Sequence, residues 1–373
     1  MDFTQLIADI SKGLTSFTWG NAVMIAVGLI LIGLAVIKEY EPVLLLPIGF
    51  GCILANIGMS SDVGMMKVLY DAGIKTELFP LLIFVGVGAM IDFTPLLAMP
   101  SMVLLGAAGQ FGIYGTLILA TLLGFPLNQA ASIGVIGAID GPTAIFVSTK
   151  LAPELLGPIA VAAYSYMSLI PIIQPPIMRL MTTKKERQIR MEYKAKPVSR
   201  TALVLFPLIV TVVISLIAPD AAPLIATLML GNLLRVSGVV DRLNKAAQNE
   251  IINIATLFLG LAIGSTMVAS SFIKLDTLMI LGLGLLAFVL DTVAGLLFGK
   301  FMAVVTRGKV NPLIGACGIS AFPMAARLSA RMAQEEDFDN YILMHAMGSN
   351  TAGQLGSVIA GGLLLAIVSG MIA

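Results

Sequence analysis

Gly137-Ala138-Ile139-Asp140-Gly141-Pro142-Thr143 places one acidic residue inside an otherwise apolar part of the chain. An ionised carboxylate at the centre of a bilayer helix costs about 2.5–3.5 kcal/mol on insertion scales, so it requires a compensating partner. Gly141 and Pro142 interrupt the helix, and broken backbone persists at that depth only inside protein or beside a wet cavity. Carbonyl oxygens and a carboxylate suit a hard cation. The stretch therefore favours a cation or proton site over a kinked helix whose Asp140 only bonds a neighbour.

The composition is that of a protein embedded in a membrane. Of the 373 residues, 58% are hydrophobic and only 12% are charged, which lies outside the usage of soluble domains. The net charge of +1 gives no indication of a nucleic-acid partner. A single histidine and two cysteines without a CxxC pattern argue against a histidine metal cluster, a Ser-His-Asp triad and a disulfide framework. We therefore expect an all-α polytopic membrane protein.

The apolar segments follow the same order in both halves of the chain. Each half has four apolar spans, one interrupted segment and one further span, which is typical of a duplicated transporter unit. Gly137-Ala138 aligns with Gly315-Ala316, and Gln174 aligns with Gln354, at nearly the same spacing. The segments are 21–37, 42–59, 78–99, 101–124, 128–150 and 155–181 in the first half, and 201–218, 221–234, 251–272, 277–306, 311–330 and 341–373 in the second.

Charge predicts how these halves are oriented. Residues 182–200 carry seven Lys and Arg residues against two Glu, so the positive-inside rule places this loop in the cytoplasm. If each interrupted segment returns to its own side, each half crosses five times and the two repeats are inverted. The interrupted segments then meet at the midplane. The predicted divisions are an interfacial amphipathic helix at 1–16, a first repeat at 17–181, a cytoplasmic basic loop at 182–200 and a second repeat at 201–373.

The second interrupted segment carries neutral polar groups in place of the acid. Ser320 falls opposite Asp140 in the repeat alignment, and a hydroxyl beside a carboxylate can share a sodium ion or a proton. Asn311, which precedes a proline, fits a sodium ligand and a helix N-cap equally well. Because Arg327 lies close to the break, we expect its guanidinium to hold a carboxyl group by two parallel hydrogen bonds. Arg331 is expected to be a surface anchor.

Polar side chains also occur inside other spans. Asn350 and Gln354 share one helix face, so their oxygens are candidates to complete a cation shell, although a run of small residues is also typical of close helix packing. The phenol of Tyr166 needs a partner, and we expect that partner to be Asp140. Asp92 and Asp291 lack a helix break, and we expect structural pairing or a position near an interface for both.

Four stretches together resemble a known family: 137–146, the Tyr166 span ending in Gln174-Pro-Pro-Ile, 311–327, and 349–357. They are similar to the beta subunit of the biotin-dependent, sodium-pumping decarboxylases that act on oxaloacetate, methylmalonyl-CoA or glutaconyl-CoA. The resemblance covers nearly the whole chain, whose compact length is closer to the acyl-CoA branch. It implies a carboxyltransferase subunit, a biotin carrier subunit, a small membrane-anchored accessory subunit, and a homo-oligomer in a prokaryotic inner membrane.

The resemblance also implies an activity and residue roles. The beta subunit would decarboxylate carboxybiotin, consume a proton and export sodium. In this chain it implies sodium binding or proton relay by Asp140 and Tyr166, and contact with carboxybiotin by Arg327. It further implies sodium sites completed by Asn311, Ser320 and Asn350, with Gly315 at a position where a side chain would crowd the break. Taken without the resemblance, the residues leave a sodium/proton secondary transporter as the alternative.

Overall fold

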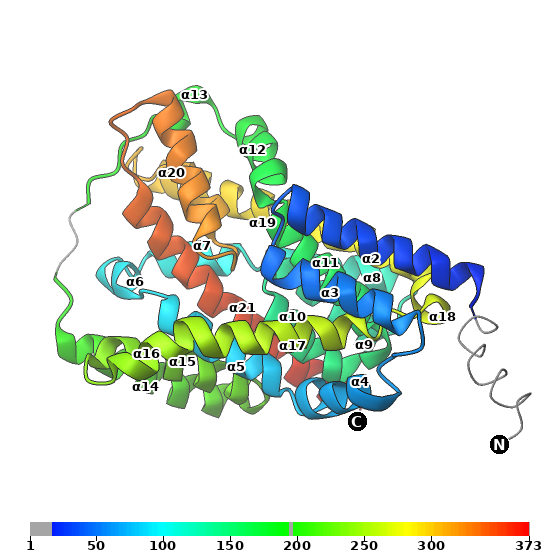
Figure 1. Cartoon of the computed structure of the whole chain (residues 1–373). Coiled ribbons are helices and arrows are strands. Elements are labelled where there is room, and N and C mark those ends of the chain that lie inside the picture. The colour runs from blue at the N-terminus through cyan, green and yellow to red at the C-terminus, as the bar shows by residue number, and fades with distance from the viewer. Residues whose placement is uncertain (1–16, 194–196, 373) are drawn as a thin grey trace, which may run out of the picture.

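The computed structural model describes residues 17–193 and 197–372, and the regular elements in this part of the chain are all helices (Figure 1). The amphipathic helix expected at 1–16 lies outside the described residues. Six helical stretches are long and apolar enough to cross a membrane, and the number rises to eight if two bent helix pairs each form one span. These stretches are α2 (Trp19–Ile37), Met102–Leu122, α14 (Arg200–Ile217), Asp241–Gly264, α19 (Leu275–Val305) and α21 (Leu343–Ile372). The predicted all-α polytopic class is confirmed.

Neither bent pair was predicted, and residues 64–75 lie outside the spans that the sequence suggested. Gly64–Lys75 and Leu78–Met90 meet at 57°, and Pro153–Ser168 and Ile170–Met181 meet at 65°. The second bend divides the predicted span 155–181. Pro171 lies in the first turn of the second helix, where its missing N–H and fixed φ favour a new helix start over continuation.

Six helices form a group that we call the panel, and its contacts cross between the two halves of the chain. Helix α3 packs on α17, and α5 packs on α15, while α2 lies along α3 and α14 along α15. Such packing of first-half helices on second-half helices is consistent with a duplicated unit. The inverted arrangement of the two repeats stays a prediction. The panel consists of α2, α3 (Pro42–Ala55), α5 (Leu78–Met90), α14, α15 (Ala222–Ser237) and α17 (Ile252–Gly264).

The other long helices form a second group, the core, which holds both interrupted segments. Helix α19 packs against α8, α11 and α12, and α21 packs against α7, α10 and α20. The core consists of α7 (Met102–Ala108), α8 (Phe111–Leu122), α9 (Leu127–Gly134), α10 (Gly141–Leu151), α11 (Leu156–Ser168), α12 (Ile170–Met181), α19, α20 (Met324–Glu336) and α21. Short helices join these elements: α4 (Gly64–Leu69), η1 (Tyr70–Lys75), α6 (Thr94–Ala98), η3 (Pro153–Leu155), α13 (Lys184–Arg187), η4 (Pro219–Ala221), α16 (Asp241–Ala246), η5 (Ala247–Ile251) and α18 (Ala269–Phe272).

Glycines allow the panel helices from the two halves to cross closely. A Cβ atom at Gly88 would lie 1.9 Å from the carbonyl oxygen of Leu228, and one at Gly231 would lie 2.0 Å from that of Val85. Small residues at such crossings are typical of membrane proteins, where close van der Waals packing drives helix association. These contacts join α5 to α15.

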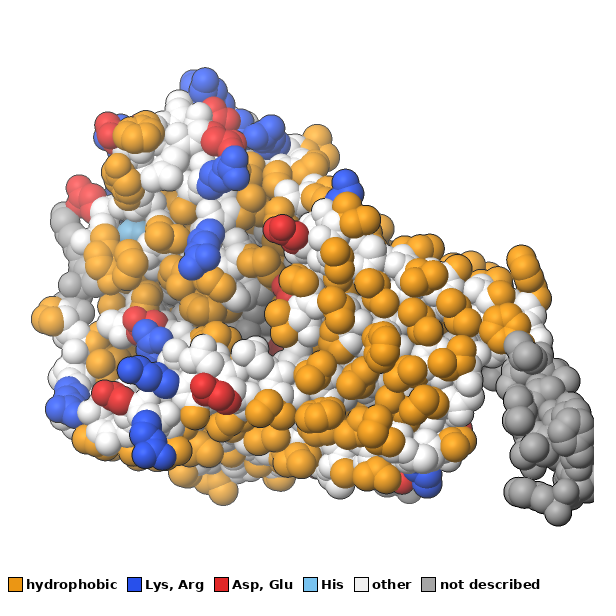
Figure 2. Space-filling model, viewed as in Figure 1, with side chains coloured by type: hydrophobic (Ala, Val, Ile, Leu, Met, Phe, Trp, Pro, Cys, Tyr) orange, Lys and Arg blue, Asp and Glu red, His pale blue; other side chains and the backbone are white. Residues whose placement is uncertain are grey.

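The outer surface is apolar, as expected of a surface that faces lipid. Helix α14 is almost entirely unburied, and its Leu208, Ile209 and Val212 are exposed. Figure 2 shows hydrophobic side chains covering much of the face drawn, whereas Lys and Arg gather toward its edges. Because lipid tails do not penalise apolar surface, this pattern is typical of a bilayer protein.

Both predicted helix breaks are present. After α9, a short helix η2 (Val135–Ala138) ends at Ile139, whose φ of 51° is left-handed, and Asp140 is extended before α10 begins. The second break consists of η6 (Pro312–Cys317) and an irregular stretch that ends where α20 begins. The irregular backbone of each break brings polar groups into the core.

The described part of the basic loop is tied to the end of α20. Arg187 Nη2 lies 2.6 Å from Glu336 Oε1, and Arg190 Nε lies 2.6 Å from Asp337 Oδ2. The hydrogen bond from Arg187 lowers the pKa of Glu336, and that from Arg190 lowers the pKa of Asp337. We call residues 182–190 the strap, because they connect α12 to the far end of α20.

Candidate functional site

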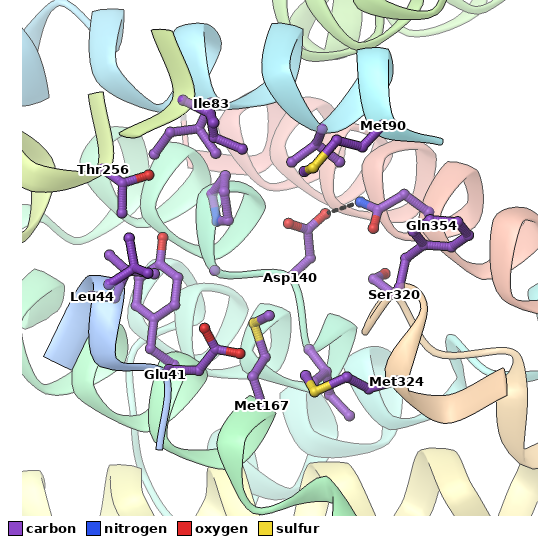
Figure 3. Close-up of a pocket in the computed structure, with 18 of the residues that line it drawn as sticks. Glu41, Leu44, Ile83, Met90, Asp140, Met167, Thr256, Ser320, Met324 and Gln354 are labelled. Carbon is purple, nitrogen blue, oxygen red and sulfur yellow. Dashed lines mark hydrogen bonds between the residues drawn. The ribbon is translucent and has the colours of Figure 1, made fainter. Parts of the chain in front are cut away.

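Asp140 lies at the first helix break, in the interior of the core. Its side chain is buried, with 5% exposed. Its Oδ2 accepts hydrogen bonds from Thr143 Oγ1 at 2.7 Å, Gln354 Nε2 at 3.0 Å and Ser357 Oγ at 3.0 Å. Figure 3 shows the bond from Gln354 to Asp140. Among the described residues, no Lys, Arg or His forms an ion pair with it. Three neutral donors therefore stabilise the carboxylate without neutralising its charge.

Gln354 was predicted as a candidate ligand of a cation shell, whereas Thr143 and Ser357 were not assigned to the site. Thr143 follows Asp140 by one helical turn, so its position was a usable signal. Gln354 and Ser357 belong to the polar run in α21, and only the packing of α21 on α10 brings them to the break. Sequence periodicity places residues on a helix face, but it does not identify the element that the face meets.

A cavity of about 400 Å³ separates this break from the panel. Its walls are mostly apolar, and the polar groups are few. Ser320, from the second break, lines the same cavity as Asp140, as the repeat alignment predicts. Figure 3 shows Ser320 and Gln354 near Asp140, with Met324 below them. Such a cavity, with a few convergent polar groups, is the common form of a small-ligand site.

Glu41 and Tyr164 are among the further polar residues of this lining that the sequence did not indicate. Glu41 precedes α3 with a left-handed φ of 37°, and Figure 3 shows its carboxylate turned into the cavity. Burial raises the pKa of Glu41. Tyr164 is 1% exposed, and its hydroxyl has no hydrogen-bond partner within the described part of the chain.

The expected pairing of Tyr166 with Asp140 is wrong. The Tyr166 hydroxyl donates to the carbonyl oxygen of Leu281 in α19. Residues two positions apart on a helix point to nearly opposite sides, so only one of the two tyrosines can face the cavity. That residue is Tyr164, whose ring packs so closely on the break that a Cβ at Gly141 would lie 2.0 Å from its Cε1.

Side-chain amides hold the carbonyl groups that the second break frees. Asn350 Nδ2 donates to the carbonyl oxygens of Cys317 at 3.2 Å and Ile319 at 2.7 Å. Gln174 Nε2 donates to that of Ala316 at 2.8 Å. The Oδ1 atom of Asn350 is buried and has no partner within the described residues, so it stays available as an acceptor.

Asn311 caps the helix that it precedes. Its Oδ1 accepts the N–H of Leu313 at 3.0 Å, and its Nδ2 donates to the carbonyl oxygens of Arg187 and Ile189, both at 2.9 Å. The N-cap interpretation is thus confirmed, and direct sodium binding by Asn311 stays a prediction. Gly315, four residues later, lies against α19, where a Cβ would come within 2.0 Å of the Gly295 carbonyl oxygen.

The two arginines that follow the second break differ in their contacts. Arg327 is exposed in the first turn of α20, and no ion pair or hydrogen bond occupies its guanidinium within the described part of the chain. Met324, one turn before it, lines the cavity. Arg331 pairs with Glu335 at 3.4 Å, as expected of a surface anchor.

Asp92 and Asp291, the two acids without a flanking Gly-Pro pair, are not part of the cavity lining. Asp92 accepts the backbone N–H of Thr94 and lies 3.7 Å from Arg235, which confirms the predicted pairing. Asp291 is fully buried, and its Oδ1 accepts the backbone N–H of Gly112 at the start of α8. Both acids therefore have local structural partners.

Membrane-crossing helices, two broken helices and a buried carboxylate without a counter-charge are together typical of helical ion-transport proteins. The profile of one family, described as the Na⁺-transporting oxaloacetate decarboxylase beta subunit, matches residues 20–368. The chain belongs to this family. It is a membrane subunit of a sodium-pumping decarboxylase.

Named relatives are similar along nearly their full length. The chain is 52% identical over 370 residues to the glutaconyl-CoA decarboxylase subunit beta of Acidaminococcus fermentans, covering 98% of each chain. It is 53% identical over 358 residues to the methylmalonyl-CoA decarboxylase subunit beta of Veillonella parvula, covering 96% of each. It is 45% identical over 423 residues to the oxaloacetate decarboxylase beta chain of Klebsiella pneumoniae, covering 96% of this chain and 98% of that one.

Proposed function

We propose that this chain decarboxylates carboxybiotin presented by a partner subunit and couples that reaction to sodium export. Family membership supports sodium transport by a decarboxylase complex. The observation that carries the site assignment is the Asp140 carboxylate, which is held by three neutral donors beside a cavity and has no permanent counter-ion among the residues that the structure describes. A buried negative charge of this kind requires a cation or a proton.

The chemistry consumes one proton for each carboxyl group removed. The C–N bond of carboxybiotin breaks, the carboxyl group leaves as carbon dioxide, and the ring nitrogen takes a proton. Arg327 is exposed next to the cavity wall and forms no ion pair with any described residue, so it is suited to hold the carboxylate by two parallel hydrogen bonds. Protonation of Asp140 would weaken its hold on sodium and favour release to the outer side.

The sodium site would be built around Asp140 and Ser320. Gln354 contributes its side-chain oxygen, and Asn350 holds the carbonyl groups of the second break with its Oδ1 free. In this proposal Asn311 and Gly315 fix the shape of that break through the cap and the close approach to α19. Tyr166 would act through α19, which its hydroxyl contacts, and not by touching Asp140.

The proposal includes the rest of a complex. A carboxyltransferase subunit, a biotin carrier subunit and a small membrane-anchored accessory subunit would assemble with this chain, which would itself form a homo-oligomer in the inner membrane of a prokaryote. The 52% and 53% identities to acyl-CoA decarboxylase subunits, against 45% to an oxaloacetate decarboxylase chain, favour an acyl-CoA substrate for the complex. The strap and its basic residues would face the cytoplasm, where the carrier approaches.

The test is sodium uptake by the purified complex in inverted vesicles, with and without avidin. The pump predicts that avidin, which blocks biotin, abolishes both carbon dioxide release and sodium uptake. A sodium/proton exchanger would instead take up sodium in response to a pH gradient alone. Avidin-insensitive sodium uptake driven by a pH gradient would overturn the proposal.

A further inference from the structure

Asp140 is not the only carboxylate that faces the cavity. Glu41 and Asp140 both line it, and the lining contains no Lys or Arg. Glu41 takes part in no ion pair within the described part of the chain. The lining therefore carries two carboxylates and no basic side chain, and its mostly apolar walls strengthen their attraction for a mobile cation or a proton.

A buried hydroxyl accompanies the second carboxylate. Tyr164 lines the cavity with its hydroxyl oxygen buried and without a hydrogen-bond partner among the described residues. Buried phenols ordinarily have a partner, so an unpaired one beside a cavity indicates that a ligand or water completes it. The Tyr164 ring lies directly against Gly141, where any side chain would collide with it.

The two carboxylates differ in how accessible they are. Glu41 is partly exposed at the start of α3, whereas Asp140 is 5% exposed at the break. Figure 2 shows a hollow in the surface with acidic side chains at its rim, and Figure 3 shows Glu41 and Asp140 turned into one cavity from different elements. A cation that enters from the surface would thus meet Glu41 before it meets Asp140.

We propose that Glu41 and Tyr164 form a docking position for the transported monovalent cation, between the open side of the cavity and Asp140. The Glu41 carboxylate supplies charge, and the Tyr164 hydroxyl supplies a neutral oxygen in place of a water ligand. Glu41 belongs to the panel and Asp140 to the core, so the cation passes from one helix group to the other. This inference rests on the proposed function, because it takes sodium as the cation that moves.

The test measures sodium uptake by the reconstituted complex over a range of sodium concentrations. Glu41→Gln should raise the half-saturating sodium concentration about tenfold, as expected for loss of one charge-assisted contact, while the rate at saturation stays within about twofold. The matched control is Glu39→Gln, the same change two residues away at an exposed side chain outside the cavity lining. It should behave as wild type.

Tyr164→Phe provides a second variant that keeps the ring against Gly141 and removes only the hydroxyl. It should raise the half-saturating sodium concentration about threefold. If Glu41→Gln does not assemble, this variant alone tests the docking position. Half-saturation equal to wild type in both variants would overturn the docking position. Wild-type complex that takes up no sodium would instead overturn the proposed function, so the two failures are distinguishable.

Discussion

At the scale of single residues, the protein stabilises a negative charge by neutral hydrogen bonds. Thr143, Gln354 and Ser357 all direct a donor to Oδ2 of Asp140, and no basic side chain competes for the carboxylate among the described residues. A fixed Lys or Arg would hold the site permanently and exclude a cation. Neutral donors leave the negative charge available for a cation that binds reversibly.

Arg327 provides a residue-scale prediction about the carboxyl group. Arg327→Lys keeps the positive charge but loses the planar fork, so carboxybiotin decarboxylation by the complex should fall at least about tenfold. The matched control is Arg331→Lys, one turn further along α20, where Arg331 pairs with Glu335. The control should stay within about twofold of wild type. Equal rates in the two variants would contradict a two-pronged clamp.

The sequence predicted the acid at the break and two of its neighbours, Ser320 and Gln354, but not Thr143, Ser357, Tyr164 or Glu41. Asp140 was predictable because Gly141 and Pro142 mark the break in the sequence itself. The choice between Tyr164 and Tyr166 was not, because both lie in one apolar helix and only packing decides which face meets the cavity. Glu41 lies about a hundred residues from Asp140 in sequence, and no periodicity connects them.

At the scale of elements, amides and glycines hold the second break in place. Asn350 and Gln174 donate to its carbonyl groups, and Asn311 caps its first turn. Gly315 allows the backbone of η6 to lie directly on α19 at Gly295. The break is therefore packed as tightly as a regular helix crossing, which keeps Ser320 at the cavity wall.

Gly315→Ala tests that packing. The added methyl group would lie 2.0 Å from the Gly295 carbonyl oxygen, so the variant should lose about 1–3 kcal/mol of stability, as overpacked cores do. Thermal unfolding in detergent measures this as a lowered Tm. The control is Gly282→Ala in α19, the helix that η6 contacts; nothing lies within 4 Å of a Cβ there, so Tm should not fall. Equal Tm values in both variants would show that η6 does not lie on α19.

The strap provides a second prediction at this scale. Glu336→Gln combined with Asp337→Asn removes the carboxylates that lie 2.6 Å from Arg187 and Arg190 and leaves the longer 3.6 Å pair of Arg190 with Asp339. Trypsin should therefore cleave within 182–193 about tenfold faster at neutral pH. Glu335→Gln is the control, since Glu335 pairs with the exposed side chains of Arg179 and Arg331. Unchanged cleavage in the double variant would contradict the attachment.

The same attachment should depend on pH. Arg187 and Arg190 lower the pKa values of Glu336 and Asp337, so the contribution of these contacts is complete above the ordinary carboxyl pKa values, about 4.3 and 3.9. It is lost as the pH falls through the lowered values. Hydrogen exchange of residues 182–193, corrected for its intrinsic pH dependence, should therefore accelerate only in strong acid. Acceleration already near pH 6 would contradict these pairings.

At the scale of the whole molecule, a cavity lies between two groups of helices. The panel supplies Glu41 and the core supplies Asp140, so both groups contribute to one polar space in an otherwise apolar protein. The order of apolar spans predicted the helical membrane class correctly, because bilayer thickness fixes the length of a span. The bend before Ile170 was missed, because proline in a first turn permits a new helix without requiring one.

The central claim is that the transported sodium ion binds the Asp140 carboxylate. The most direct measurement is sodium uptake into inverted vesicles by the reconstituted complex carrying Asp140→Asn, compared with wild type. The matched control is Asp92→Asn, which makes the same change at an acid that pairs with Arg235 outside the cavity lining. We predict that Asp140→Asn lowers uptake at least about a hundredfold and that Asp92→Asn stays within about threefold of wild type. Equal sodium uptake by Asp140→Asn and wild type would contradict the claim.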